Sequence, residues 1–364
     1  IWVAVITPRG LEQYRFGTTG TQAGAAAPTA STVFAIGSIT KVFTGLLLQQ
    51  MIAAGQVSLD DTVGRLWPSP KLHPSVRKIR LRELVTHMSG LPRMPPSFAP
   101  PDAGDPYASY SATLLESALA KVALKGGPHP HRYSNLGMGL LGYLLSRKAG
   151  RPYPVLVRER VLKPLGLHHT GVPPHPLPLS WAARMARPYS DGVTVPKHWR
   201  FAALAGAGAL HATGADLIRF VRLMLAAGRR PRGFLGAALA PLAKRAKGQV
   251  ASGWMIDPDG WVWHNGGTGG YRAHLAFHPG KGVAVIALTS ASSLAADYLV
   301  GNLRRKMAGE KLGRLPPSLT LSTAQARRYA GTFHCGKRRI PLVIKPQGPR
   351  LLARFSDQPF YRVY

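Results

Sequence analysis

Strand-like segments at both ends of the chain, separated by a long helical stretch, constrain the fold most strongly. Apolar runs bounded by turn residues predict strands at 1–6, 12–16, 253–256, 261–264, 272–278 and 283–289. The region from about 60 to 200 is rich in proline and otherwise has apolar residues at helical spacing, at 81–87, 111–124, 136–148 and 153–162. We therefore predict an α/β (α+β) sheet domain interrupted by helices.

The 364 residues leave room for about two domains. We predict one domain over 1–312, with a sheet lobe from 1–61 and 201–312 and an all-helical lobe over 62–200. A linker containing Leu315-Pro316-Pro317 leads to residues 318–364. This tail has short strand patterns at 329–333, 340–345 and 351–355, and it is small for an independent core. We interpret it as a β-rich appendage that is incomplete.

The charge of the chain is unusual. Lys and Arg number 47 against 15 acidic residues, which gives +32, and the basic residues are dispersed rather than gathered beside a recognition motif. We expect nonspecific attraction to anionic envelope polymers and no specific nucleic-acid partner. The single Cys335 excludes a disulfide framework and a zinc site built on several thiolates. No apolar run is long enough to span a membrane.

The first motif with chemical potential is Ser38-Ile39-Thr40-Lys41. Residues i and i+3 of a helix share a face, so the Lys41 amine can reach the Ser38 hydroxyl and activate it as a nucleophile. A predicted helix over 38–54 would place Ser38 at its N-cap and Gly55 at its C′ position. Taken alone, the motif is more typical of a capping serine with a solvated lysine one turn later.

Two further motifs follow. Tyr133-Ser134-Asn135 joins a turn-rich segment to an apolar helix, and its phenol could shuttle protons while Asn135 holds a substrate amide or Lys41. Alone it is also typical of a helix cap with a packed tyrosine. The run from His264 to Tyr271 is rich in glycine, which lets a substrate backbone approach a strand edge, or simply forms a hairpin turn.

In this order the three motifs resemble the serine penicillin-recognising hydrolases: class C β-lactamases, D-alanyl-D-alanine peptidases and related esterases. The pattern S-x-x-K, Y-x-N and [KH]-x-G is matched by Ser38/Lys41, Tyr133/Asn135 and His264/Gly266. Linking segments such as Leu84–Pro92 and Leu162–Leu167 also resemble the family, over roughly residues 1–310. The resemblance implies the β-lactamase/transpeptidase-like fold, an antiparallel sheet flanked by helices with an inserted helical lobe.

The resemblance also implies roles for the site residues. Ser38 would form an acyl-enzyme, and Lys41 and Tyr133 would pass its proton to the leaving group. Asn135 would position the substrate and Lys41, and His264 would neighbour Tyr133. The backbone N–H groups of Ser38 and Gly267 would form the oxyanion hole, with Gly266 beside them.

The chain departs from the class C pattern in two places. His264 replaces the usual lysine, and a neutral imidazole holds a carboxylate less firmly than an ammonium group. Gly267 replaces the hydroxyl residue that often binds carboxylate, so Thr268, Asn265 or Arg272 would have to substitute. These departures argue against efficient β-lactam turnover and leave peptidase or esterase activity as alternatives.

We predict a serine hydrolase that acts on D-Ala-D-Ala-type peptides or β-lactams without a cofactor. The alternatives are an esterase using the same residues and, more distantly, a catalytically weak envelope-binding protein. We interpret four histidines as loop residues rather than metal ligands: His129, His131, His168 and His169. From the resemblance and the basic composition we expect a monomer that is periplasmic or secreted. Because the sequence opens directly on a strand-like segment, we expect that a signal peptide has been removed or that the chain has been trimmed.

Overall fold

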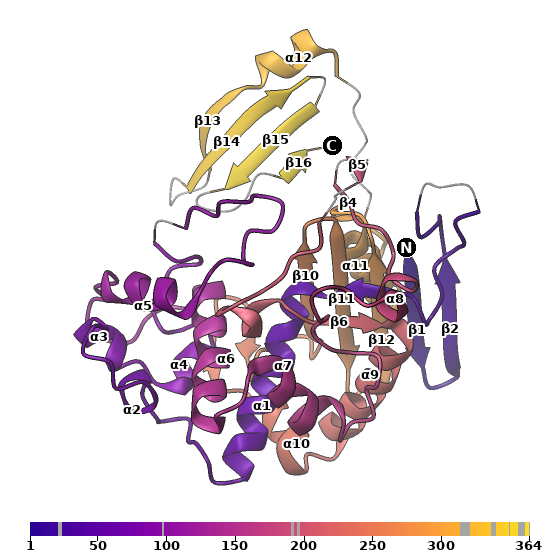
Figure 1. The fold of residues 1–364 in the computed structure, drawn as a ribbon. Coiled ribbons are helices and arrows are strands. Elements are labelled where there is room, and N and C mark those ends of the chain that lie inside the picture. The colour runs from indigo at the N-terminus through magenta and orange to yellow at the C-terminus, as the bar shows by residue number, and fades with distance from the viewer. Residues whose placement is uncertain are drawn as a thin grey trace. The chain divides into compact units, whose positions relative to one another are not determined.

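The computed structural model describes residues 1–20, 24–96, 98–190, 193–194, 197–313, 321–335, 340–348, 350–355 and 361–363. The chain folds into two compact units, Ile1–Ala308 and Gly309–Tyr364 (Figure 1). All residues of the three sequence motifs lie in the first unit.

An eight-stranded antiparallel sheet forms the framework of the first unit, in the order β2-β1-β12-β11-β10-β9-β8-β7 (Figure 1). Its strands are β1 (Trp2–Thr7), β2 (Gly10–Arg15), β7 (Ala243–Lys244), β8 (Gln249–Val250), β9 (Met255–Ile256), β10 (Val262–Thr268), β11 (Tyr271–His278) and β12 (Val283–Thr289). Strand β1 pairs with β12, with Val3 opposite Ala287, so the two ends of the unit meet in one sheet. The predicted sheet is confirmed, including its antiparallel pairing.

Helices cover both faces of this sheet. Helix α11 (Ala295–Met307) packs on one face, where Val300 joins a buried cluster with Val285 and Ala287. Helices α9 (Gly214–Arg229) and α10 (Gly233–Leu239) belong to the core on the other face. Every residue of β12 is buried, which explains why that strand reads as a continuous apolar run rather than as an alternating one.

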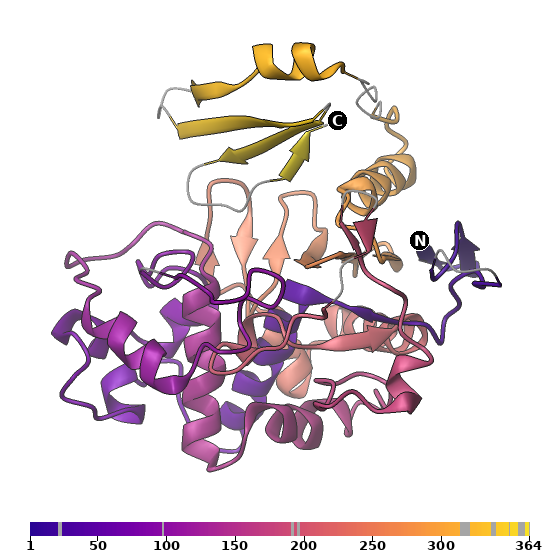
Figure 2. The same cartoon turned by 45° about the horizontal axis from the view of Figure 1, so that its top comes forward.

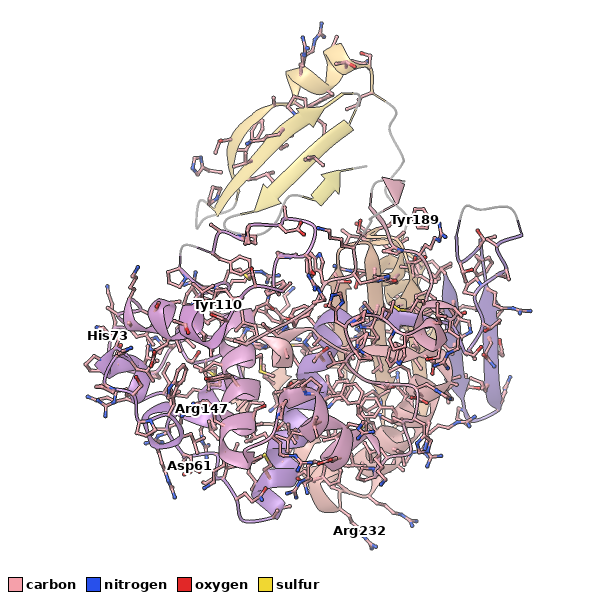
Figure 3. The ribbon with its side chains drawn as sticks, in the orientation of Figure 1. Asp61, His73, Tyr110, Arg147, Tyr189 and Arg232 are labelled. Atoms are coloured by element: carbon pink, nitrogen blue, oxygen red, sulfur yellow. The ribbon has the colours of Figure 1, made fainter. Side chains whose placement is uncertain are left out.

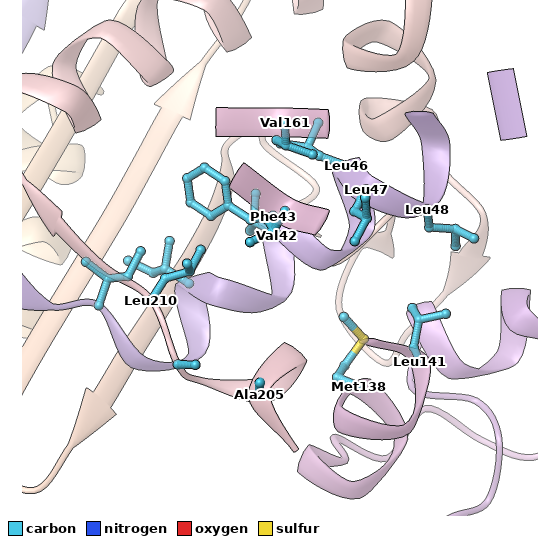
Figure 4. Packing of buried hydrophobic residues seen from close by; sticks show 14 of the residues in the cluster. Val42, Phe43, Leu46, Leu47, Leu48, Met138, Leu141, Val161, Ala205 and Leu210 are labelled. Atoms are coloured by element: carbon cyan, nitrogen blue, oxygen red, sulfur yellow. The ribbon is translucent and has the colours of Figure 1, made fainter. Parts of the chain in front are cut away.

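Helix α1 (Thr40–Ala53) occupies the centre of the core (Figure 4). Leu47 and Leu48 lie on the side of Met138 and Leu141, whereas Phe43 points away from them and stacks on Phe220, so α1 is buried on almost all sides (Figure 4). The helix ends as predicted, because Gly55 follows it with a φ of 67°. Its start differs from the prediction, since a 3₁₀ turn, η1 (Gly37–Ile39), precedes it.

The helices between residues 62 and 200 include α6 and α7, which contact α1, and those from α2 to α6 lie away from strands β1 and β12 (Figures 1 and 2). They are α2 (Val63–Leu66), α3 (Pro74–Arg77), α4 (Leu81–Val85), α5 (Ala112–Ala120), α6 (Asn135–Ala149), α7 (Tyr153–Val157), the π-helical turn η2 (Arg158–Leu162) and α8 (Leu179–Ala182). Strands β4 (Tyr189–Ser190) and β5 (Val193–Thr194) form a small separate pair. None of the helices in the described ranges has the length and apolar character needed to cross a bilayer.

Two short strands connect this region to the site. Strand β3 (Val33–Ala35), just before η1, pairs with β6 (His211–Thr213), with Ala35 opposite His211. The 3₁₀ turn η3 (Ala205–Ala207) precedes β6 and packs against α6. This pairing brings the start of α1 next to a segment about 170 residues later in the chain.

In its described residues, the second unit contains a four-stranded antiparallel sheet and one helix. The strands are β13 (Gly331–Cys335), β14 (Ile340–Gln347), β15 (Arg350–Phe355) and β16 (Tyr361–Val363), and the helix is α12 (Thr323–Arg328). The strand patterns predicted in this tail are confirmed. Helix α12, which begins with a capping box at Ser322 and Gln325, was not among the predicted elements.

Candidate active site

Ser38 and Lys41 lie where the 3₁₀ turn η1 passes into α1. The Lys41 Nζ is 2.8 Å from Ser38 Oγ and 2.7 Å from the carbonyl oxygen of Ala207. The prediction that Ser38 caps the helix is wrong, because Ile39 occupies the N-cap and no side chain accepts a hydrogen bond there. The Ser38 hydroxyl is therefore not used as a cap and instead faces the Lys41 amine.

The environment of Lys41 disfavours its charged form. The side chain is fully buried, and burial, followed by the charge of Arg93, holds the pKa of Lys41 well below its ordinary value of 10.5. An ammonium group has three N–H donors, and hydrogen bonds to two acceptors are present among the described residues. A neutral amine fits better: it can donate to Ala207 and turn its lone pair to the Ser38 hydroxyl, as a general base must.

Tyr133 completes the group around Ser38. Its ring centroid lies 4.9 Å from Lys41 Nζ, and it sits just before α6, whose N-cap Ser134 accepts a hydrogen bond from Gly137 N at 2.8 Å. Burial raises the pKa of Tyr133 to about 12, although its hydrogen bond with Ser38 acts in the opposite direction. The phenol is therefore protonated near neutral pH and can donate a proton or a hydrogen bond.

Strand β10 lies directly against η1, and glycine permits this approach. A Cβ on Gly266 would lie 2.0 Å from the carbonyl oxygen of Ile36 and 2.9 Å from the backbone nitrogen of Ser38. A Cβ on Gly37, whose φ is 49°, would lie 2.7 Å from the nitrogen of Gly267. The backbones that carry the Ser38 and Gly267 N–H groups are thus brought together, as an oxyanion hole requires.

The edge of β10 beside the site is open over most of its length. Strand β9 pairs with β10 only at Val262 and Trp263, and within the described strands no partner continues along that edge through Thr268. An extended substrate can add to such an edge through backbone hydrogen bonds. The glycine-rich run is therefore mainly strand, and only Gly269 and Gly270 form the turn to β11.

His264 faces the core side of β10 and is buried. Its Nδ1 lies 2.6 Å from the carbonyl oxygen of Asn265, while its Nε2 has no hydrogen-bond partner among the described residues. Burial, followed by the charge of Lys41, lowers the pKa of His264 to about 3. The imidazole is therefore neutral and supplies no charge for a substrate carboxylate.

Asn135 is the first residue of α6, and the hydrogen bonds of its side chain do not include Lys41. Its Nδ2 lies 3.5 Å from both Met94 Sδ and Tyr107 Oη, and its Oδ1 is buried without a partner in the described part of the chain. The predicted role in holding Lys41 is not seen, because Lys41 is held by Ser38 and Ala207. The amide is left available for a substrate.

Sequence reasoning missed Asp297, which lies on α11 and collects three side chains from β10 and β11. Its Oδ1 accepts from Asn265 Nδ2 at 2.8 Å and lies 2.8 Å from His274 Nδ1, and its Oδ2 accepts from Arg272 Nε at 2.5 Å. Although burial acts to raise it, the His274 hydrogen bond and the Arg272 charge hold the pKa of Asp297 below its ordinary value. Two of the three predicted substitutes for the absent hydroxyl, Asn265 and Arg272, are thus tied to Asp297.

The third predicted substitute, Thr268, has a buried hydroxyl with no partner in the described ranges.

Two other residues lie against Tyr133. The His87 ring lies 4.5 Å from that of Tyr133, and its Nδ1 accepts from Ser134 N at 3.1 Å, which agrees with a structural role. Arg93, which the motifs did not indicate, places its Cζ 5.2 Å from the Tyr133 centroid. The described residues contain no group of three or more His, Cys, Asp or Glu side chains placed to hold a metal ion.

Comparison with known proteins agrees with this geometry. A family model described as Beta-lactamase matches residues 3–309. Penicillin-binding protein 4 of Amycolatopsis lactamdurans is 27% identical over 357 residues, which cover 84% of this chain and 86% of that protein. The D-alanyl-D-alanine-carboxypeptidase/endopeptidase AmpH of Escherichia coli is 27% identical over 293 residues, 73% of each chain.

Solved structures show the same fold. A β-lactamase/D-alanine carboxypeptidase from Yersinia pestis has a TM-score of 0.71 at 23% identity, covering 84% of this chain and 92% of that chain. A class C β-lactamase from Rhodobacter sphaeroides has a TM-score of 0.71 at 19% identity, with coverage of 84% and 93%. With a family model that spans most of the sequence, a shared fold and a lysine set against a serine at the head of α1, the chain belongs to the β-lactamase family of serine hydrolases.

Proposed function

We propose that the protein hydrolyses amide or lactam bonds of D-Ala-D-Ala-type peptides or β-lactams through an acyl-enzyme on Ser38. The observation that carries this proposal is the 2.8 Å distance between Lys41 Nζ and Ser38 Oγ, with Lys41 fully buried. The relatives named as a penicillin-binding protein and as a D-alanyl-D-alanine carboxypeptidase support it.

Acylation uses the three side chains around Ser38. As Ser38 Oγ bonds to the substrate carbonyl carbon, its proton passes to the Lys41 amine, and the carbonyl oxygen becomes an oxyanion. The N–H groups of Ser38 and Gly267 stabilise this charge. When the tetrahedral intermediate collapses, the carbon–nitrogen bond breaks, and the leaving nitrogen takes a proton from Tyr133, which regains one from Lys41.

Deacylation repeats these steps with water. A water molecule loses a proton to the Lys41–Tyr133 pair as its oxygen bonds to the acyl carbon, and Ser38 leaves with that proton. The product acid releases its remaining proton to solvent and departs as a carboxylate, and the neutral Lys41 amine is restored. How fast this second half proceeds determines whether a β-lactam is turned over or retained as a stable adduct.

The open edge of β10 favours an extended peptide or a β-lactam over a small ester, because it offers backbone hydrogen bonds to a chain laid beside it. The neutral His264 weighs toward the alternative, a carboxylesterase that uses the same residues on small acyl esters. We place the enzyme in the periplasm or outside the cell as a monomer that associates nonspecifically with anionic envelope polymers, in keeping with its +32 charge.

A substrate comparison tests this proposal. Purified protein is assayed in parallel with a penicillin, an acylated D-Ala-D-Ala peptide and a small acyl ester, and kcat/KM is measured for each. Release of D-alanine or opening of the lactam ring supports the proposal. Fast ester cleavage with neither of these reactions moves the assignment to the esterase.

A further inference from the structure

Among the residues that the structure describes, the Arg93 guanidinium has neither an ion-pair partner nor a hydrogen-bond partner. Its Cζ lies 5.2 Å from the Tyr133 centroid. Arg272, by contrast, is paired with Asp297 at 2.5 Å. The charges of Arg272 and Asp297 cancel and Lys41 is disposed to be neutral, so Arg93 leaves the site with one uncompensated positive charge.

An unpaired arginine in a half-buried position, such as Arg93, is unusual in this chain. Most acidic side chains of the described residues are already paired with basic ones. Asp105, for example, pairs with Arg200, and Asp257 pairs with Arg304, and in both pairs the carboxylate is largely buried. Unpaired arginines are mostly on the surface, as at Arg232, which extends into solvent (Figure 3). Arg93 instead acts on catalytic groups: its charge helps to lower the pKa of Lys41 and opposes the rise in the pKa of Tyr133.

The backbone fixes Arg93 in place. Its carbonyl oxygen accepts hydrogen bonds from the backbone N–H groups of Asn135 at 2.9 Å and Leu136 at 3.2 Å, at the start of α6. The neighbouring Pro92 carbonyl accepts from the Ser134 hydroxyl at 2.6 Å. The guanidinium is thus presented from a rigid turn, and contact with the face of an aromatic ring leaves its N–H groups available to a planar anion.

We propose that Arg93 binds a carboxylate of the substrate and makes the enzyme selective for anionic substrates. This inference rests on the proposed acyl-serine function and adds to it a residue that determines specificity. The partner group is a carboxylate because the guanidinium fork matches it in two parallel hydrogen bonds, and because His264 cannot supply the charge. The carboxylate can come from the acyl part of the substrate or from the leaving group.

Two matched substrate pairs test the proposal and separate these sources. The first pair is a penicillin with a phenylacetyl side chain and one with a phenylmalonyl side chain, which differ by one carboxylate on the acyl part. The second is an acylated D-Ala-D-Ala peptide and its C-terminal amide, which differ by one carboxylate on the leaving group. Both pairs are assayed with the wild type, Arg93→Gln, Arg93→Lys and, as a control, Arg222→Gln, which removes an exposed charge on α9.

We expect the wild type to prefer the acidic member of at least one pair. Arg93→Gln should reduce that preference roughly 10- to 100-fold, mainly through KM, Arg93→Lys should restore part of it, and Arg222→Gln should leave it unchanged. The pair in which the preference falls identifies the source of the carboxylate. Because Arg93 also influences the pKa of Lys41, the ratio within a pair is the decisive quantity, since that influence acts on both members.

The proposal is overturned if Arg93→Gln slows acidic and neutral substrates equally, or if the preference survives the substitution. Failure of the proposed function is a different result, in which the wild type acylates with none of the four compounds. The same variants are then compared on a neutral acyl ester and its hemisuccinate analogue. Loss of the acidic preference there would uphold the role of Arg93 within an esterase.

Discussion

Lys41 bridges two parts of the chain: its Nζ lies 2.8 Å from Ser38 Oγ, in the turn just before α1, and 2.7 Å from the carbonyl oxygen of Ala207, far along the sequence. The second contact fixes the amine, so that its lone pair can face the nucleophile. We therefore expect Lys41, held in this way in a fully buried position, to serve as a base rather than as a surface cation.

Replacing Lys41 with a cation that cannot act as a base should therefore stop acylation, even though the positive charge is kept. Arg cannot lose its proton at any accessible pH, so Lys41→Arg should lower the acylation rate by about 10²- to 10⁴-fold. The measurement is the single-turnover rate with a penicillin or ester, with circular dichroism to verify folding. A variant that folds and acylates at the wild-type rate would remove Lys41 from the mechanism.

The pH dependence should carry the signature of the lowered Lys41 pKa. The active form is the neutral amine, so the acylation rate should rise as pH increases through the lowered pKa and then stay level well below pH 10.5. Tyr133, with a pKa of about 12, stays protonated throughout this range. A rate that keeps rising to the ordinary lysine pKa would show that Lys41 is an unperturbed ammonium group.

The same shift predicts a stability effect. Between the lowered pKa and 10.5 the unfolded chain binds more protons at Lys41 than the folded chain, so this residue makes the free energy of unfolding rise with pH. Urea unfolding of the wild type and of Lys41→Met, at several pH values across this window, isolates the contribution. Identical slopes for the two proteins would contradict it.

A methyl group at Gly266 should disable the oxyanion hole. Its Cβ would lie 2.0 Å from the Ile36 carbonyl oxygen, so β10 must move away from η1 and carry the Gly267 N–H with it. Gly266→Ala should lower acylation by roughly 10²- to 10³-fold, the cost of losing one oxyanion donor. Gly301→Ala on α11 is the control, because nothing lies within 4 Å of its added Cβ. Equal activity of the two variants would argue against the close approach.

Asp297→Asn should destabilise the fold, because it removes the partner of Arg272 and His274 at a carboxylate that is only 19% exposed. We expect a loss of about 2 kcal/mol in the free energy of unfolding by urea titration. The matched change Asp60→Asn breaks ion pairs at a carboxylate that is 58% exposed and should cost at most about 1 kcal/mol. Similar losses in the two variants would show that the Asp297 network contributes little.

Local sequence patterns predict much of this molecule. The spacing of Ser38 and Lys41 predicts that their side chains meet, as they do at 2.8 Å, and the predicted bounds of β12 agree with the structure. The predicted cap at Ser38 is wrong for a physical reason that lies outside the pattern. Gly37 takes a φ of 49° and packs on β10, and this contact forces a 3₁₀ turn ahead of the helix.

Other features depend on contacts between residues far apart in sequence, where periodicity carries no information. The Asp297 network joins α11 to β10 and β11, and its three partners are read from sequence only as scattered polar residues. The place of Arg93 over Tyr133 depends on the turn at Pro92 docking on the start of α6. Neither arrangement can be predicted without the fold.

Intact-mass spectrometry after incubation with a penicillin, followed by peptide mapping, tests the central claim most directly. The account predicts an adduct of the mass of the penicillin on the peptide that contains Ser38, and none on the Ser38→Ala variant, whose binding to an anionic polymer should be unchanged. If the lactam is turned over too fast to trap, rapid acid quenching should capture the same adduct. Labelling that survives in Ser38→Ala, or that maps to another residue, would contradict the assignment of Ser38 as the nucleophile.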